Sequence, residues 1–214
     1  MSAQLNPPET AAQSSVEDFF TVRNLHSLHA GPFSFTLAAG ECLVVRGPSG
    51  AGKSLLLRML ADLDPNLGDV RLDGVERGSV SAPAWRRMVV FQGAKPAWWE
   101  TTAAAHFTAP QRRDTLALLP LVGLDGTHLE REITLLSTGE RQRMALVRSL
   151  VNHPRVLLLD EPTAALDQAS VLMVETLLQQ RLETGLAIVL VTHSLEQAVR
   201  MGDRELRIGA RMPS

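Results

Sequence analysis

The stretch of sequence that decides the fold is Gly47-Pro48-Ser49-Gly50-Ala51-Gly52-Lys53-Ser54. It matches the pattern G-x-x-x-x-G-K-[S/T] at every required position. The apolar run 42–45 before it predicts a strand, and apolar residues recur after it at helical spacing: Leu55, Leu56, Met59, Leu60 and Leu63. A glycine-rich turn between a strand and a helix is the setting in which this pattern binds the phosphates of a nucleotide.

Each part of this loop has a role in holding phosphate. The glycines allow backbone N–H groups to converge on phosphate oxygens, and the helix N-terminus adds partial positive charge. We expect Lys53 to reach the β- and γ-phosphates and the Ser54 hydroxyl to ligate Mg²⁺. Residues 47–54, together with Leu55, are therefore predicted to bind a nucleoside triphosphate. A plain glycine turn between strand and helix is the alternative.

Two carboxylates follow a second apolar run. Residues 156–159 predict a strand buried on both faces, and Asp160 and Glu161 come directly after it. The carboxyl ends of parallel strands lie beside the phosphate loop, so both acids are expected to face the nucleotide. Asp160 is predicted to hold Mg²⁺, directly or through water, and Glu161 to polarise a water for attack on the γ-phosphate. Two exposed turn acids before Pro162 are the alternative.

Composition bounds the class of protein. The 214 residues are 45% hydrophobic and 21% charged, with a formal net charge of -2. This balance excludes a disordered chain, a collagen-like fibre and a disulfide scaffold, and it gives no support to nucleic-acid binding by bulk electrostatics. The single cysteine, Cys42, is predicted to be a buried and inert thiol, which fits a reducing compartment. The longest apolar run, 186–191, is too short to cross a bilayer.

The remaining segments predict an α/β layout. Residues 1–18 indicate a flexible lead-in without signal-peptide character. Short apolar stretches between 19 and 37 predict strands broken by a turn, and the run 187–191 predicts another buried strand. Residues from about 95 to 152 are rich in alanine and leucine and predict several helices inserted between strands.

With these motifs in place, the chain resembles the ATP-binding subunits of ATP-binding cassette (ABC) transporters, over roughly residues 19–208. The segment Leu136-Ser137-Thr138-Gly139-Glu140-Arg141-Gln142-Arg143 resembles the family's signature sequence. Gln92 follows the strand 88–91 as the family's Q-loop glutamine does. Ala165-Leu166-Asp167 resembles its D-loop, and Val191-Thr192-His193 resembles its switch histidine.

This resemblance implies a fold and a function. The fold is a P-loop NTPase core of class α/β with a mostly parallel sheet, an N-terminal antiparallel β subdomain, and a helical subdomain inserted at about 95–152. One ABC ATP-binding domain would span 19–214. The implied protein hydrolyses ATP with Mg²⁺, forms a homodimer around two ATPs and drives a separate transmembrane permease. It would be cytoplasmic, held on the inner face of the cell membrane by that permease, with no nucleic-acid partner.

The resemblance also implies residue roles. His193 would contact the γ-phosphate and orient the attacking water, and Gln92 would join the Mg²⁺ shell and report nucleotide state to the helical insert. These two and Glu161 are the predicted catalytic residues. The signature residues Ser137, Thr138, Gly139 and Glu140 would contact the nucleotide held by the other subunit of the dimer, and Asp167 would also bind nucleotide. By itself the segment 137–140 is also a capping box that starts a helix, which needs no ligand.

The chain departs from the family pattern at several positions. Thr138 stands where the signature usually has glycine, and Glu140 where glutamine is usual, which adds charge near the γ-phosphate. Tyrosine, which often stacks on the adenine, is absent from the chain. His26 or His29 is the expected replacement.

The pair Trp98-Trp99 follows Gln92, where the family receives its membrane subunit. We expect at least one tryptophan in that groove, and packing inside the subdomain is the alternative.

Two other functions stay open. An ABC-type ATPase that acts on nucleic acid or the ribosome is one, and a P-loop kinase or GTPase is the other. The short C-terminal end mildly favours a minimal exporter-like or orphan pair over carbohydrate importers. The sequence predicts neither the transported substrate nor the direction of transport.

Overall fold

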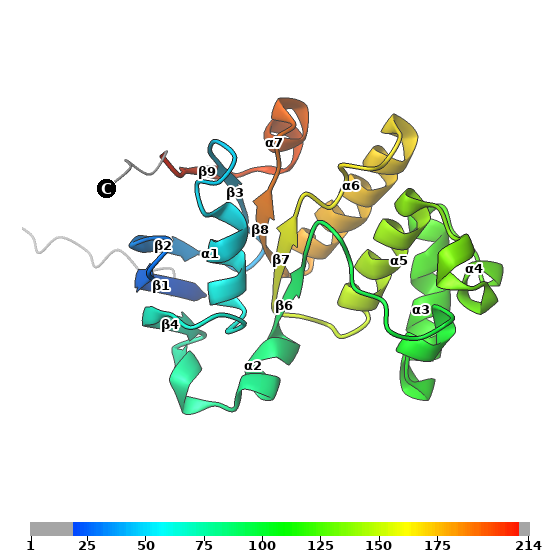
Figure 1. Ribbon diagram of the computed structural model, residues 1–214, viewed down its shortest axis with the longest axis horizontal. Coiled ribbons are helices and arrows are strands. Elements are labelled where there is room, and N and C mark those ends of the chain that lie inside the picture. The colour runs from blue at the N-terminus through cyan, green and yellow to red at the C-terminus, as the bar shows by residue number, and fades with distance from the viewer. Residues whose placement is uncertain (1–18, 210–214) are drawn as a thin grey trace, which may run out of the picture.

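Two sheets and the helices that cover them make up residues 19–209, the part of the chain that the computed structural model describes (Figure 1). The predicted lead-in 1–18 lies outside the described residues. The larger sheet has the order β6-β7-β8-β3-β9, and its neighbouring strands are parallel throughout. Its strands are β3 (Cys42–Arg46), β6 (Val89–Gln92), β7 (Val156–Asp160), β8 (Ala187–Val191) and β9 (Arg204–Arg207).

The smaller sheet is antiparallel, in the order β2-β1-β4-β5. Its strands are β1 (Phe20–His26), β2 (Phe33–Leu37), β4 (Leu67–Leu72) and β5 (Val75–Glu76). It lies beside α1 (Lys53–Leu60), on the side of that helix away from the parallel sheet (Figure 1). The predicted fold class, a P-loop core with a parallel sheet and an N-terminal antiparallel sheet, is confirmed.

The parallel sheet separates two hydrophobic cores, because successive side chains of a strand point to opposite faces. Along β7, Leu157 and Leu159 enter one core and Val156 and Leu158 the other. The first core is shared with the helices α5 (Thr138–Leu150), α6 (Gln168–Glu183) and α7 (Leu195–Met201). The second is shared with α1 and with Trp85 of α2 (Ala82–Met88). Burial on both faces is why these strands are continuous apolar runs.

The segment between the neighbouring strands β6 and β7 forms short helices (Figure 1). In chain order these are η2 (Ala104–His106), η3 (Ala109–Gln111), α3 (Arg112–Leu118), η4 (Leu119–Val122), α4 (Thr127–Glu130), η5 (Ile133–Leu135) and α5. The remaining 3-10 helix, η1 (Arg77–Ser79), lies before β6. Pro110 and Pro120 each stand in the first turn of a 3-10 helix, where proline is tolerated. Helices are thus present where the sequence predicted them, although residues 93–103 form none. The limits of a separate helical subdomain stay a prediction.

The structure tests two further predictions, the burial of Cys42 and the length of the helix after the phosphate loop. Cys42 is fully buried, as expected, and this burial raises the pKa of its thiol to about 12. The expectation that Leu63 continues the helix after the phosphate loop is wrong. Helix α1 ends at Leu60, and Leu63 is exposed because Asp62 takes a positive φ of 56° and turns the chain away. Within residues 19–209, every helix is too short or too polar to span a membrane.

Candidate functional site

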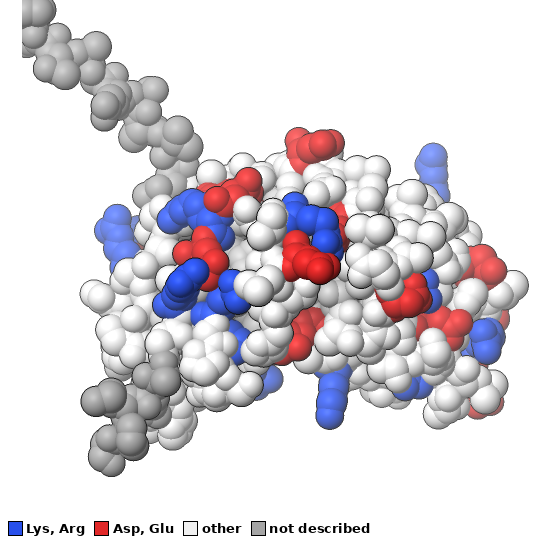
Figure 2. All heavy atoms as spheres, turned by 90° about the horizontal axis from the view of Figure 1, so that it is seen from above, with Lys and Arg blue, Asp and Glu red and all other residues white. Residues whose placement is uncertain are grey.

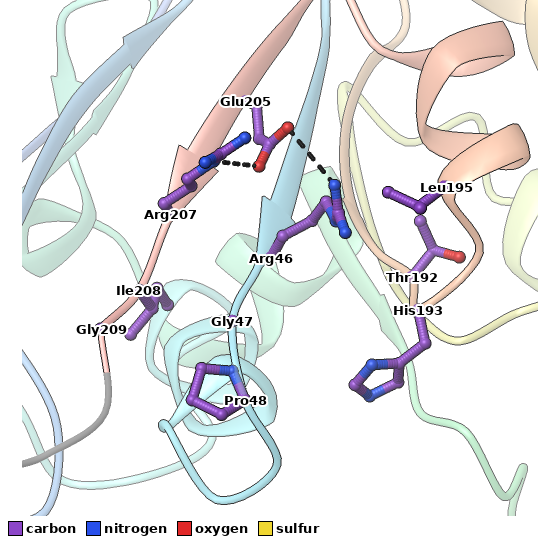
Figure 3. A pocket seen from close by; sticks show the side chains of 10 residues that line it. All are labelled: Arg46, Gly47, Pro48, Thr192, His193, Leu195, Glu205, Arg207, Ile208 and Gly209. Carbon is purple, nitrogen blue, oxygen red and sulfur yellow. Dashed lines mark hydrogen bonds and ion pairs between the residues drawn. The ribbon is translucent and has the colours of Figure 1, made fainter.

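The carboxyl ends of β3, β7 and β8 bring three predicted motifs to one edge of the parallel sheet. The phosphate loop 47–54 follows β3, the acidic pair ends β7, and His193 follows β8. A cavity of about 600 Å³ lies beside the loop, lined by Gly47, Pro48, His193 and residues of β9 (Figure 3). Parallel strand order alone therefore places residues more than a hundred positions apart around one opening.

The phosphate loop has the backbone geometry of an anion-binding turn. Gly52 has a φ of 95° and directly precedes α1, with no side-chain cap on the first helical N–H groups. These N–H groups remain available to an anion. Gly50 has a φ of 78°, and a Cβ built there would meet nothing within 4 Å, so the loop is open at this point.

Lys53 lies inside the turn. Its side chain is buried, and Nζ donates to the carbonyl oxygens of Gly47 at 2.8 Å and of Pro48 at 2.9 Å. The ammonium group is therefore fixed within the loop. Ser54 follows it on the first turn of α1 and is exposed. This arrangement offers phosphate oxygens one buried cation and one neighbouring hydroxyl.

The acidic pair divides into one buried and one half-buried side chain. Asp160 is the last residue of β7 and is buried. Glu161 takes a φ of 49°, a left-handed conformation that is uncommon for glutamate, and its N–H donates to the carbonyl of Val191 at 2.9 Å. Strained backbone of this kind concentrates at functional sites, where neighbouring contacts hold it. Here the contact with β8 helps to hold it.

His193 lies against the carboxylate of Glu161. Its Nε2 is 3.2 Å from Glu161 Oε1, and both side chains are open to solvent on one side. The next residue, Ser194, caps α7 by accepting the N–H of Gln197 at 3.2 Å. The structure therefore brings together a carboxylate and an imidazole beside the phosphate loop. A carboxylate so placed can accept a proton from a water, and the imidazole can orient that carboxylate.

Gln92 is buried at the end of β6 and turns toward α5. Its Nε2 lies 3.5 Å from the carbonyl oxygen of Gln142, and its Oε1 accepts the Ser149 hydroxyl at 3.4 Å. Among the described residues, no hydrogen bond joins Gln92 to Ser54 or Asp160. The geometry thus connects Gln92 with the helical insert, while its place in a metal shell stays a prediction.

The signature segment begins α5 with a capping box, as the sequence predicted. Ser137 Oγ accepts the Glu140 N–H at 3.1 Å, and Glu140 Oε2 accepts the Ser137 N–H at 2.7 Å. The Ser137 N–H is the main reason that the pKa of Glu140 lies below its usual value. Glu140 Oε1 is also 3.4 Å from Nε2 of His128. The extra carboxylate is therefore occupied by its own helix start.

Thr138 and Gly139 occupy the first turn of α5. The Thr138 hydroxyl is exposed and accepts from Arg141 at 3.2 Å. A Cβ at Gly139 would lie 3.2 Å from Leu166 and 3.3 Å from the carbonyl of Ala165, so the signature segment packs on the D-loop. Sequence reasoning missed this contact. Within residues 19–209, no hydrogen bond or ion pair joins residues 137–140 to the phosphate loop of the same chain.

Asp167 caps α6. Its carboxylate accepts the N–H of Ser170 at 2.9 Å and the Ser170 hydroxyl at 3.0 Å. These hydrogen bonds, the backbone one above all, hold the pKa of Asp167 below its usual value. The side chain is exposed at the surface, so a structural role as N-cap is visible and a role toward nucleotide stays a prediction.

The predicted Mg²⁺ ligands are of the right chemical kind. Mg²⁺ prefers oxygen donors and usually takes few carboxylates from the protein, with substrate phosphates completing its shell. Ser54 offers a hydroxyl and Asp160 a carboxylate, and no hydrogen bond or ion pair from the described residues engages that carboxylate. Within the same residues no three His, Cys, Asp or Glu side chains form a metal cluster. The donors fit a cation that is held jointly with phosphates.

The two candidate adenine neighbours differ in position. A cavity of about 460 Å³ lies between residues 27–34 and the phosphate loop, and His29, Gly50 and Ala51 are among the residues that line it. His26 does not line this cavity, and its Nδ1 is 2.7 Å from the carbonyl oxygen of Asn24. Of the two histidines, only His29 borders the space beside the loop.

The tryptophan pair is split between interior and surface. The Arg148 guanidinium lies 4.2 Å from the centroid of the Trp98 ring and 5.0 Å from that of Trp99, and the His106 ring meets both edge-on. Trp98 is half-buried against the first core, whereas Trp99 is 69% exposed. Burial lowers the pKa of Arg148. Trp98 thus packs inside the helical insert, as the alternative interpretation expected. Trp99 lies at the surface, where a partner could contact it.

Sequence reasoning gave no role to Gln142, although it lies in the signature segment. Its Nε2 donates to the carbonyl oxygen of Glu161 at 2.8 Å, while its own carbonyl receives Gln92. Gln142 therefore connects Glu161, the candidate base, with Gln92. The signal in the sequence is a polar side chain at position 142, one helical turn before the apolar residues Ala145 and Leu146 of α5.

Comparisons with known proteins show which family and fold this chain is similar to. The family model described as "ABC transporter" matches residues 31–164. The aliphatic sulfonates import ATP-binding protein SsuB 2 of Agrobacterium fabrum is 37% identical over 176 residues, which cover 80% of this chain and 66% of that protein. The spermidine/putrescine import ATP-binding protein PotA of Methylococcus capsulatus is 37% identical over 205 residues, 90% of this chain and 53% of that protein. The chain thus spans about half to two thirds of the length of these relatives.

A solved structure is similar in fold. It is the dimeric structure of a post-hydrolysis state of an ATP-binding cassette bound to ADP and Pi. It has a TM-score of 0.78 and 24% sequence identity, over 90% of this chain and 97% of that chain.

Proposed function

Because this chain belongs to the ABC transporter family of ATP-binding proteins, we propose that it binds and hydrolyses ATP as a homodimer and drives a separate membrane permease. The 3.2 Å contact between Glu161 and His193, beside the phosphate loop, carries most weight. It supports the proposal because Glu161 would then serve as proton acceptor, and His193 as its orienting group, for attack on the γ-phosphate of a loop-bound nucleotide. Phosphate release from MgATP by the purified chain tests this function, and absence of release would refute it.

Each site residue has a proposed role in ATP hydrolysis. The loop N–H groups and Lys53 bind the phosphates, and Ser54 and Asp160, with Gln92, would hold Mg²⁺. When bound, Mg²⁺ neutralises charge on the β- and γ-phosphate oxygens. Glu161 takes a proton from the attacking water, and His193 holds the Glu161 carboxylate in position. Because closure around ATP moves the helical insert, Gln92 and Gln142 connect that movement to the base.

Assembly and location follow from the same proposal. Two copies would bind two ATPs head to tail, with residues 137–140 of each copy facing the nucleotide of the other through the exposed N-terminus of α5. The permease would hold the dimer at the inner face of the membrane. The relatives named above are import proteins for sulfonates and for spermidine and putrescine. Their names favour import of a small solute over export.

Nucleic acid is not among the proposed partners. The formal net charge is -2, and on the face seen in Figure 2 acidic and basic side chains alternate without forming a basic stripe. Proteins that bind nucleic acid through its phosphates present such a stripe.

Trp99 is proposed to contact the permease. It is a large exposed aromatic ring, held against Arg148 and His106, in the segment that follows Gln92. Aromatic side chains of this kind dominate interface energies. We expect Trp99→Ala to weaken binding of the membrane subunit at least about tenfold and to leave ATP affinity unchanged, measured by co-purification and by nucleotide titration.

Leu67→Ala is the matched control for Trp99, because Leu67 is 67% exposed and lies on β4 of the antiparallel sheet. If Trp99→Ala and Leu67→Ala weaken co-purification of the membrane subunit equally, a specific role of Trp99 is refuted.

His29 is proposed to stack on the adenine. Stacking of a base on an aromatic side chain contributes about 1–3 kcal/mol, so His29→Ala is expected to weaken ATP and ADP binding about fivefold or more. Binding of inorganic triphosphate should not change, because it has no base. Titration of the three ligands measures this. His26→Ala is the control, and a larger loss of ATP affinity in that variant would transfer the role to His26.

A further inference from the structure

A buried carboxylate outside the phosphate loop joins the helices α6 and α7. Glu175 lies on α6 with 3% of its surface exposed. Its Oε2 accepts Arg200 Nε at 2.6 Å, and its Oε1 accepts Arg200 Nη2 at 2.9 Å and Gln197 Nε2 at 3.2 Å. A buried charge is stable only when it is paired and hydrogen-bonded, and this one is paired in bidentate geometry. The carboxylate therefore fixes α7 against α6.

Gln197 links Glu175 to the segment that follows the acidic pair. Its side chain is 1% exposed, and its Oε1 accepts the Thr163 hydroxyl at 3.1 Å. Thr163 lies two residues after Glu161, in the link between β7 and α6. A continuous series of hydrogen bonds thus runs from Glu175 through Gln197 to the segment that carries the base.

The same residues fix the position of the histidine. The Gln197 N–H donates to Ser194 Oγ at 3.2 Å, and Ser194 directly follows His193. A cavity of about 250 Å³ is lined by Glu161, Thr163, His193 and Gln197 together with residues of α6 and α7. Glu161 and His193 therefore share one cavity wall with the hydrogen-bonded series that begins at Glu175.

We propose that Glu175 is a positioning residue for ATP hydrolysis. Through Gln197 it fixes both Thr163 and the first turn of α7, and so it holds Glu161 and His193 at their 3.2 Å separation. It does not touch the nucleotide. This role rests on the proposed function of the Glu161–His193 pair.

The direct test replaces Glu175 by glutamine. Glu175→Gln keeps the size of the side chain but loses the bidentate ion pair with Arg200. We expect kcat for ATP hydrolysis to fall about tenfold, with KM and the dissociation constant of ATP unchanged, because misplacement of a reacting group lowers turnover without altering phosphate binding. Thr163→Val, which removes one hydroxyl and preserves shape, is expected to lower kcat in the same direction.

Glu196→Gln is the matched control. Glu196 also faces Arg200, at 3.7 Å, but its side chain is 79% exposed, so its loss should leave kcat unchanged. Glu175→Gln should also shift the NMR resonances of the His193 imidazole, a readout independent of turnover. In a His193→Ala background, Glu175→Gln should lower kcat by a smaller factor than in the native chain, because only the position of Glu161 is then left to disturb.

Several results would overturn the positioning role. Unchanged kcat in both Glu175→Gln and Thr163→Val is one, and an equal fall of kcat in the His193→Ala background is another. Loss of ATP binding in Glu175→Gln would assign Glu175 to the general stability of the fold instead. A native chain without ATPase activity would refute the proposed function itself, whereas an active native chain with unaffected variants would refute only the role of Glu175.

Discussion

The Glu161→Gln variant is expected to bind ATP as the native chain does and to release phosphate at least about a hundredfold more slowly. Glutamine has nearly the same shape but cannot accept the proton of the attacking water. The left-handed backbone of Glu161 and its bonds to Val191 and Gln142 involve main-chain atoms, so the substitution leaves them in place. Steady-state phosphate release and nucleotide titration measure the two effects separately.

The control for this variant is Glu130→Gln. Glu130 is exposed on α4 and pairs with Arg112 on the surface, at 3.0 Å, so hydrolysis should not change. Native turnover in Glu161→Gln would remove Glu161 as the base. Loss of ATP binding would indicate instead that the carboxylate supports the phosphate site.

The second large effect is expected for Lys53→Met. Lys53 is the buried cation of the phosphate loop, and its Nζ lies within 2.9 Å of two loop carbonyls. A hydrogen bond to a charged group contributes about 1.5–3 kcal/mol, so ATP affinity should fall about tenfold to a hundredfold. Methionine keeps the length and apolar part of the side chain. Titration with ATP measures the loss, and thermal unfolding verifies that the loop still folds.

Lys95→Met is the control for Lys53→Met. Lys95 is exposed shortly after Gln92 and lies outside the phosphate loop, so its removal should leave ATP affinity unchanged. Equal affinities in the native chain and Lys53→Met would contradict phosphate binding by this loop.

Local sequence was sufficient for the features that depend on neighbours in the chain. The run 156–159 predicts a strand because both faces of that strand are buried. The spacing of Ser137 and Glu140 predicts the capping box because its two hydrogen bonds span three residues. Parallel strand order then places Glu161 and His193 near the phosphate loop, and this too follows from the sequence pattern.

Features that depend on tertiary packing were not predictable from the sequence. Glu175 and Arg200 are separated by 25 positions and are joined only because α6 and α7 pack together. Which histidine borders the cavity beside the loop depends on how the turn 27–34 folds back.

Glu140 was expected to bring negative charge toward a phosphate. Its carboxylate accepts the N–H at its own helix start, as the predicted capping box requires, and its charge toward a phosphate of the other copy stays a prediction. That hydrogen bond joins residues three positions apart and is predictable from the sequence. The contact of Glu140 with His128 depends on tertiary packing and is not.

The central claim is that two copies of this chain close around ATP and separate after hydrolysis. Light scattering of Glu161→Gln at saturating MgATP tests it most directly, because this variant should bind ATP without hydrolysing it. We expect a mass twice that of one 23.3 kDa chain with MgATP, and the mass of a single chain with MgADP. A variant that binds ATP yet keeps the mass of a single chain would contradict the claim.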